Sequence, residues 1–316
     1  MPKSTFKISN LSLDERLLFM ESFAIDLDTY VKFLGRDAGE LCQTDEEFAE
    51  KFAQFQNYLE KRRQGFSVAA IIGKKDFYEH TFFVNENVLV PRPETEELVE
   101  LAINKIDEII SAESFVKKDK NGNSIYNINV ADVCTGSFCI GLSIYLHFLD
   151  RGVRFKLFAS DISEKALVVA KNNLEYFRKT YMETNNFDIS SDVCLFSSNL
   201  FEDYPQYSIC VNDKFDLIIS NPPYVATKDK DGLSQEVLNE PSIALFAGED
   251  GLSVIENLVK EAPLFLKKGG VLLLEHGIEQ GNEVKAIFEK NGFKDIETIK
   301  DLTARPRFTR GVVSDE

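Results

Sequence analysis

The sequence predicts an α/β protein with a mainly parallel, doubly wound sheet and a smaller helical module in front of it. Three observations lead to this prediction. From residue 94 onward, short apolar runs typical of buried strands alternate with stretches of helical spacing, the first 65 or so residues show helical spacing alone, and a short β-rich segment separates the two regions. Ligands of such a sheet bind where its parallel strands end.

The amino-terminal region is expected to fold as a separate helical domain over residues 1–68. Ser12 to Glu15 and Thr44 to Glu47 both fit the capping box, in which a hydroxyl and a carboxylate satisfy free backbone N–H groups at the start of a helix. The apolar side chains that would face a small shared core are Leu17, Leu18, Phe23, Phe48, Phe52, Phe55 and Leu59.

Around Gly73 the pattern changes to short β-rich pieces that include residues 88–90, and turn-forming asparagines lie among them. We therefore expect a β-hairpin linker over residues 69–92 and the main domain over residues 93–316. The strands predicted in that domain cover residues 128–133, 155–160, 193–197, 215–220 and 271–276. The basic run from Arg305 to Arg310 is interpreted as a charged strand at the edge of the sheet.

Composition limits the function. The 316 residues are 44% hydrophobic, and 36 basic against 52 acidic side chains give a net charge of -16, which disfavours nucleic acid as a substrate. Five cysteines without a Cys-x-x-Cys pair signal neither a disulfide framework nor a zinc site. Because no signal peptide or membrane-length apolar run is recognisable, we expect a cytoplasmic protein with no membrane partner.

A turn of small residues follows the first predicted strand, in Val130-Ala-Asp-Val-Cys134-Thr-Gly136-Ser-Phe-Cys-Ile-Gly141. Such a turn lets the backbone approach a ligand closely, and free N–H groups at the following helix can hold polar groups. Asp161 ends the next strand, where a carboxylate is placed to accept hydrogen bonds from the ribose hydroxyls of an adenosine. The plainer interpretations are an ordinary strand-to-helix turn and a helix cap by Asp161 or Ser163.

The strand at 215–220 runs directly into Asn221-Pro222-Pro223-Tyr224. Two prolines lock the backbone and remove its donors, so carbonyl oxygens and the Asn221 amide remain at the strand tip. Such a site can hold a planar NH2 group. An ordinary loop is the plainer interpretation, but the two upstream motifs at suitable spacing argue against it.

The Asn-Pro-Pro-Tyr sequence resembles the signature of amino-methyltransferases that act on adenine, cytosine or glutamine amides. The segment Val88-Leu-Val-Pro-Arg-Pro-Glu-Thr-Glu-Glu-Leu-Val-Glu100 narrows the resemblance. It is similar to the segment that precedes the catalytic domain in the peptide-chain release factor glutamine methyltransferases, the PrmC/HemK family. The similarity extends over roughly residues 70 to 312, about three quarters of the chain.

The resemblance implies a Rossmann-like class I methyltransferase domain with a mainly parallel seven-stranded sheet, a β-hairpin linker and a small helical domain that docks the substrate. It also implies S-adenosylmethionine as the methyl donor, no metal, and class I release factors as partners of a monomeric enzyme. The residues expected to bind the cofactor are Cys134, Thr135, Gly136, Ser137, Phe138, Asp161, Leu200 and Asn221. Those expected to bind the substrate glutamine are Asn221, Pro222, Pro223 and Tyr224, with Asn221 and Pro222 as the catalytic pair.

The turn departs from the family pattern, because Gly-x-Gly-x-Gly is replaced by Cys134-Thr-Gly136-Ser-Phe138. Phe138 is expected to crowd the methionine part of the cofactor or to alter helix packing. Two other functions therefore stay open. One is an adenine or cytosine amino-methyltransferase acting on nucleic acid; the other is a non-catalytic binding protein in which Phe138 closes the cofactor pocket.

Overall fold

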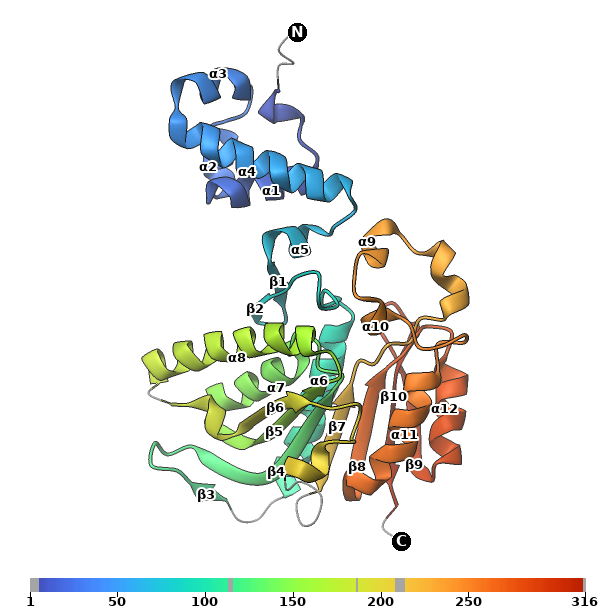
Figure 1. Cartoon of the computed structure of the whole chain (residues 1–316). Coiled ribbons are helices and arrows are strands. Elements are labelled where there is room, and N and C mark those ends of the chain that lie inside the picture. Colours follow the sequence, from blue (N-terminus) through green and yellow to red (C-terminus); the bar gives the residue numbers. More distant parts are fainter. Residues whose placement is uncertain (1–5, 113–115, 186, 208–213, 315–316) are drawn as a thin grey trace. The chain divides into compact units, whose positions relative to one another are not determined.

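The computed structural model describes residues 6–112, 116–185, 187–207 and 214–314 (Figure 1). It contains two compact units. The amino-terminal unit consists of the chain up to Lys74 together with Ser234–Asn239, and the sheet unit consists of the rest. The division into 1–68, 69–92 and 93–316 stays a prediction. Within the described part of the chain, no helix is long and apolar enough to cross a membrane.

The amino-terminal unit is helical, as expected. Its α-helices are α1 (Leu13–Phe23), α2 (Leu27–Val31), α3 (Ala38–Thr44), α4 (Glu46–Arg63), α5 (Val68–Ile72) and α9 (Gln235–Leu238). Buried aromatic side chains from α1 and α4 form its core, and Phe19 stacks on Phe23 with ring centroids 4.3 Å apart. The prediction for Leu17 is wrong, because this residue is 40% exposed while Leu18 beside it is buried.

One of the two predicted capping boxes is present. The Ser12 hydroxyl accepts from the Glu15 amide, and the Glu15 carboxylate accepts from the Ser12 amide. The prediction for Thr44 is wrong, because Thr44 ends α3 and its hydroxyl donates back to carbonyls of that helix. Asp45 caps α4 instead, since its carboxylate accepts from the Phe48 amide.

The sheet unit contains one eight-stranded, mostly parallel sheet among the described residues, which confirms the predicted fold class. Its strands are β3 (Lys117–Lys118), β4 (Ser124–Val133), β5 (Val153–Asp161), β6 (Val193–Ser197), β7 (Phe215–Ser220), β8 (Leu266–Glu275), β9 (Phe293–Lys300) and β10 (Pro306–Val313). Seven of them lie in the order β6-β5-β4-β7-β8-β10-β9, and β3 pairs with the start of β4. Within this sheet, the described residues form three antiparallel pairs, β3 with β4, β8 with β10 and β9 with β10, and the other pairs are parallel.

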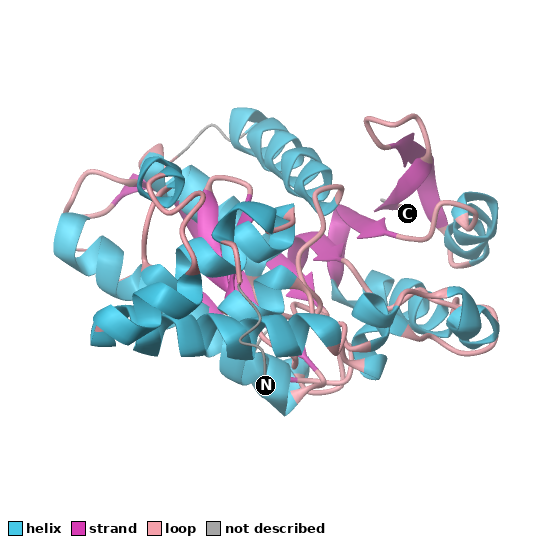
Figure 2. Cartoon of the chain, turned by 90° about the horizontal axis from the view of Figure 1, so that it is seen from above, coloured by secondary structure: helices cyan, strands magenta, loops and turns pink. Residues whose placement is uncertain are grey.

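The central strands are continuous apolar runs because both faces of the sheet are covered by helices (Figure 2). Along β8, Val271 and Leu273 face one core while Leu272 and Leu274 face the other. The first core includes α6 (Thr95–Ala112), α7 (Cys139–Asp150) and α8 (Glu164–Asn185). The second includes α11 (Ser253–Phe265) and α12 (Gly281–Lys290). This arrangement brings the ends of β4, β5 and β7 to one edge.

A β-hairpin lies within the range in which the linker is expected. Strands β1 (Lys74–Phe77) and β2 (His80–Phe83) pair, and Phe82 packs on Phe177 of α8 with ring centroids 5.3 Å apart. Residues 88–90 form a loop rather than a strand. The Val90 amide donates to the Glu240 carboxylate at 3.3 Å and not to a neighbouring strand.

The edge-strand interpretation of the basic carboxyl-terminal run is wrong. Strand β10, which carries Arg307 and Arg310, lies between β8 and β9. Carboxylates balance the arginines, since Arg310 pairs with Glu297 at 2.7 Å and Arg305 with Asp301 at 3.3 Å. An interior position is therefore compatible with these charges.

Candidate active site

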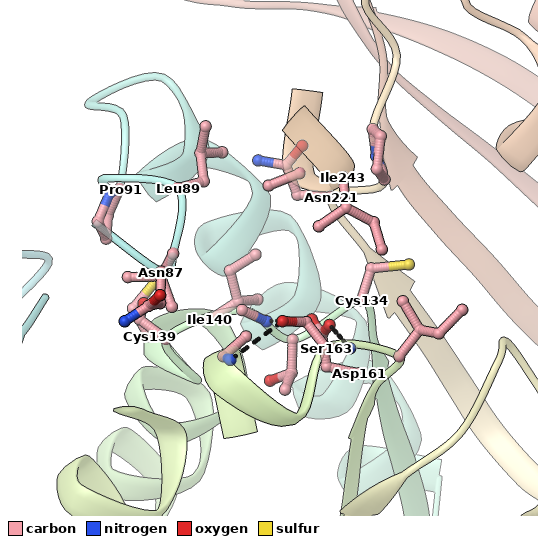
Figure 3. A pocket seen from close by; sticks show the side chains of 18 of the residues that line it. Asn87, Leu89, Pro91, Cys134, Cys139, Ile140, Asp161, Ser163, Asn221 and Ile243 are labelled. Carbon is pink, nitrogen blue, oxygen red and sulfur yellow. Dashed lines mark hydrogen bonds between the residues drawn. The ribbon is translucent and has the colours of Figure 1, made fainter. Parts of the chain in front are cut away.

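A pocket opens where β4, β5 and β7 end (Figure 3). It encloses about 700 Å³ of empty space, including open solvent at its mouth. In Figure 3, Asn87, Leu89 and Pro91 lie along one side and Asn221 and Ile243 along the other. The sequence-predicted residues that line it are Cys134, Thr135, Gly136, Ser137, Asp161, Asn221 and Pro223.

Asp132, at the end of β4, holds the small-residue turn in shape. Its Oδ2 atom accepts from the Thr135 hydroxyl at 2.6 Å and from the Gly141 amide at 3.0 Å. The Asp132 side chain is fully buried, and this burial, reinforced by nearby Asp161 and opposed by the two hydrogen bonds, raises its pKa to about 7. Gly136 adopts φ +57, and a Cβ added there would meet no atom within 4 Å. The turn is thus rigid and leaves free space above Gly136.

Asp161 links the turn after β4 to the end of β5 beneath the pocket. Its two carboxylate oxygens accept from the Gly136 amide at 2.9 Å and from the Ser163 amide at 2.8 Å, the two bonds drawn in Figure 3. Each oxygen keeps a further lone pair for a ligand hydroxyl. Burial raises the pKa of Asp161, and the two amide bonds partly offset that rise. The cap of α8 comes from Ser163, whose hydroxyl accepts from the Ala166 amide at 3.2 Å.

Asn221 follows β7 directly and has one end of its amide anchored. Its Nδ2 donates to the Thr95 hydroxyl at 3.3 Å. Its Oδ1 is buried and has no hydrogen-bond partner among the described residues. A buried acceptor without a partner is uncommon in native proteins and calls for an explanation. The free oxygen on a pocket-lining residue therefore suggests a place for a donor from a ligand.

Tyr224 and Pro222 lie beside the pocket rather than on its wall. The Tyr224 hydroxyl donates to Glu275 Oε1 at 3.1 Å, and burial next to Glu275 raises the pKa of the phenol. Glu275 is 1% exposed, and burial raises its pKa too. Pro222 is buried. The neighbouring polar groups at this edge are therefore held by bonds within the protein.

Phe138 and Leu200 also lie away from the pocket wall. Phe138 adopts φ +68, and its side chain is fully buried in the core shared by α7 and the sheet. A Cβ on Gly141 would come within 2.6 Å of the Phe138 ring, so a glycine is needed there. Leu200 is partly buried and packs against the second core. The expected crowding of the pocket by Phe138 is not seen, and the alternative of altered helix packing fits its position.

Several residues that shape the pocket were not predicted. Asn87, Val88, Leu89, Ile243 and Ala244 line it. Asn173 on α8 is fully buried and joins two segments, because its amide bonds both Phe83 and the Ser137 carbonyl. Thr95 links Asn221 to Glu275. The position of Thr95 in the Arg-Pro-Glu-Thr-Glu segment could have marked it as a candidate. The sequence did not indicate which residues its hydroxyl bonds.

The chain is similar to known methyltransferases. It matches the Eco57I restriction-modification methylase family over residues 141–247. The release factor glutamine methyltransferase of Neisseria gonorrhoeae is 35% identical, with 90% of this chain and 88% of that protein aligned. Its Pasteurella multocida counterpart is 31% identical over 82% and 79% of the two chains. The bifunctional methyltransferase of Rickettsia felis is 34% identical, and this chain covers 49% of it.

A solved methyltransferase from Pyrococcus furiosus aligns over 82% of this chain and 98% of its own, with 17% identity and a TM-score of 0.44. The parallel sheet with its antiparallel last strands and the pocket at the strand ends, together with the relatives, define an S-adenosylmethionine-dependent methyltransferase of class I. More narrowly, the chain belongs to the release factor glutamine methyltransferase family, as the resemblance in its sequence implied.

Proposed function

We propose that this protein methylates the side-chain amide nitrogen of the glutamine in the Gly-Gly-Gln motif of class I peptide-chain release factors. The observation that carries the proposal is the buried, unpartnered Oδ1 of Asn221 on the wall of the pocket. A primary amide has two N–H hydrogens to donate. The family relationship supports a release factor as the source of that amide.

The pocket fits S-adenosylmethionine, which supplies an electrophilic methyl group when bound. Asp161 has lone pairs free for the ribose hydroxyls, and the open space above Gly136 admits a ligand close to the backbone. Cys134, Thr135 and Ser137 complete the wall. Contributions from Phe138 and Leu200 are proposed to be indirect, through the shape of the turn and of the loop after β6. Among the described residues, no group of three or more His, Cys, Asp or Glu is arranged to hold a metal.

The amide nitrogen is a weak nucleophile because its lone pair is delocalised into the carbonyl, so the protein must orient it. Asn221 Oδ1 is proposed to accept one hydrogen of the substrate amide, and the Pro222 carbonyl the other. Both contacts would hold the nitrogen in line and favour the charge that develops on it as the N–CH3 bond forms and the S–CH3 bond of the donor breaks, which leaves a neutral thioether. One amide hydrogen would then be lost as a proton through one of these two hydrogen bonds; orientation of this kind is worth about 7 to 11 kcal/mol. Pro223 and Tyr224 are proposed to pack around the amide and exclude water.

The amino-terminal unit is proposed to dock the release factor, and the enzyme is proposed to act as a monomer in the cytoplasm, where translation terminates. The comparisons favour neither alternative raised by the sequence. The net charge of -16 works against a nucleic-acid substrate. A pocket closed by Phe138 is not supported, because that ring is buried in the core.

Mass spectrometry of a purified release factor, incubated with the protein and S-adenosylmethionine, tests the proposal. We expect the Gly-Gly-Gln peptide to gain the mass of one methyl group, and the gain to fall by about a hundredfold or more with Asn221→Ala, as for other oriented hydrogen-bond contacts. Asn291→Ala is the matched control, because Asn291 caps α12 through its own helix. Equal loss in both variants, or no gain with the parent protein, would contradict the proposal.

A further inference from the structure

The amide of Asn221 has two ends with opposite polarity, and the methyl transfer proposed above needs one of them. Only Oδ1 accepts a hydrogen from the substrate NH2, whereas Nδ2 would present its own hydrogens to those of the substrate. The two orientations have nearly the same shape, so packing alone discriminates weakly between them. Something polar must select one, and this argument rests on the proposed function.

Thr95 at the start of α6 contacts the Nδ2 end. Its hydroxyl oxygen lies 3.3 Å from Asn221 Nδ2 and accepts from it. The same hydroxyl donates its single hydrogen to Glu275 Oε2 at 2.8 Å. Because a hydroxyl has one hydrogen, Thr95 has no second hydrogen with which to bond the oxygen of the Asn221 amide. Thr95 therefore offers Asn221 only an acceptor, and only Nδ2 can use it.

Glu275 at the end of β8 determines the direction of the Thr95 hydrogen. Its carboxylate is buried, and both of its oxygens accept hydrogen bonds, from Thr95 and from the Tyr224 hydroxyl. Burial opposes ionisation of Glu275, but nearby Arg307 and the hydrogen bonds from Thr95 and Tyr224 favour the ionised form. An ionised carboxylate has no hydrogen to donate, so the Thr95 hydrogen points toward it. Thr95 is itself only 2% exposed, so its hydroxyl is largely shielded from solvent.

We infer that Thr95 and Glu275 are positioning residues that fix the orientation of the Asn221 amide, and that they thereby make the site selective for glutamine over glutamate. With Oδ1 free, the site attracts the NH2 of a glutamine and repels the acceptor oxygens of a glutamate. With the amide reversed, Nδ2 would attract a glutamate carboxylate instead. The preference for a glutamine over a glutamate of nearly equal size thus depends on Thr95 and Glu275.

Thr95→Val removes the hydroxyl at almost constant volume, whereas Thr95→Ser keeps it. Glu275→Gln replaces the carboxylate that Thr95 contacts with an amide, which can either donate or accept a hydrogen bond. Thr309→Val is the matched control, because Thr309 is also fully buried and bonded, to His276 at 3.0 Å, but on β10. The measurements are kcat and KM on a Gly-Gly-Gln peptide, the ratio of Kd values for Gly-Gly-Glu and Gly-Gly-Gln peptides, and the Tm of each variant.

We expect Thr95→Val and Glu275→Gln to lower kcat by about tenfold or more and to reduce the preference for the Gln peptide by a similar factor. Thr95→Ser should stay within about threefold of the parent on both measures, since it keeps the donor and the acceptor. Thr309→Val should change Tm without changing the Gln to Glu preference. A reduced Tm alone does not alter that preference, so the preference separates positioning from general destabilisation.

If Thr95→Val retains the parent's preference and kcat, or merely matches Thr309→Val, the positioning role is wrong while the proposed function stands. If the parent protein methylates no Gly-Gly-Gln peptide, the proposed function itself is wrong and the positioning role is lost with it. Glu275→Gln provides the same test by an independent change if Thr95→Val does not fold.

Discussion

Phe138 occupies a left-handed backbone position at which a side chain is costly. Its φ of +68 favours glycine, yet the ring is fully buried against Gly141 and the first core of the sheet unit. Phe138→Gly would remove about 1 kcal/mol of backbone strain but would leave a cavity, which usually costs about 3 to 5 kcal/mol for a phenylalanine. We expect the free energy of unfolding to fall by about 2 to 4 kcal/mol.

Urea unfolding measures this loss, and calorimetric titration with S-adenosylhomocysteine measures affinity in the same variant. Affinity is expected to change by less than about threefold, because the ring lies outside the pocket wall. A sharp gain in affinity, from none detectable in the parent, would instead place the ring in the cofactor site and support a non-catalytic protein.

Site residues that belong to short sequence motifs could be predicted. Residues whose role depends on contacts with distant parts of the sequence could not. Asp161 ends one recognisable strand and Asn221 directly follows another, so their place at the sheet edge could be predicted from the alternation of strands and helices. The Thr95–Glu275 bond joins positions 180 residues apart, and no local pattern encodes it. Phe138 was expected near the cofactor from its position in the turn, but its positive φ turns the ring into the core.

At the scale of elements, the short helix α9 is held in the amino-terminal unit by contacts around Gly65. The Asn239 amide donates to the Gln64 carbonyl at 2.8 Å, and Glu236 pairs with Arg62 at 3.1 Å. Gly65 adopts φ +90, and a Cβ there would lie 2.5 Å from the Gln235 side chain. Gly65→Ala should therefore combine backbone strain with a clash against α9.

We expect Gly65→Ala to speed hydrogen exchange in residues 234–239 by about tenfold or more, because local opening becomes easier by more than about 1 kcal/mol. Gly35→Ala is the matched control, since Gly35 adopts φ +80 and a Cβ there meets nothing within 4 Å. Equal exchange of α9 in the two variants would show that the clash between a side chain at position 65 and Gln235 does not open α9.

Helices and strands with a clear hydrophobic pattern were predicted well, but the elements with which they pair in the sheet were not. The predicted strands at 193–197 and 215–220 coincide with β6 and β7. The basic run was misplaced because charge on a strand usually indicates an edge, whereas here carboxylates on β9 and in the loop before β10 balance it. Residues 88–90 look like a strand because they are apolar, but Val88 and Leu89 instead line the pocket.

At the scale of the whole molecule, the chain contains separate hydrophobic cores in its two units. The core of the amino-terminal unit is built from its own aromatic side chains, and the two cores of the sheet unit share none of them. The proposed cofactor residues all belong to the sheet unit. A ligand that binds only there stabilises that unit directly and the other only as far as the two are coupled.

Calorimetry of the full chain should therefore show two transitions. S-adenosylhomocysteine at about 100 times its Kd should stabilise one of them by about 2.7 kcal/mol and leave the other nearly unchanged. Hydrogen exchange identifies the shifted transition, since peptides from β4 and β5 should gain protection while peptides from α1 and α4 should not. Removal of the ligand by dialysis should reverse the shift. A single transition that moves as a whole would mean that the two units unfold together, and that cofactor binding and the amino-terminal unit are energetically coupled.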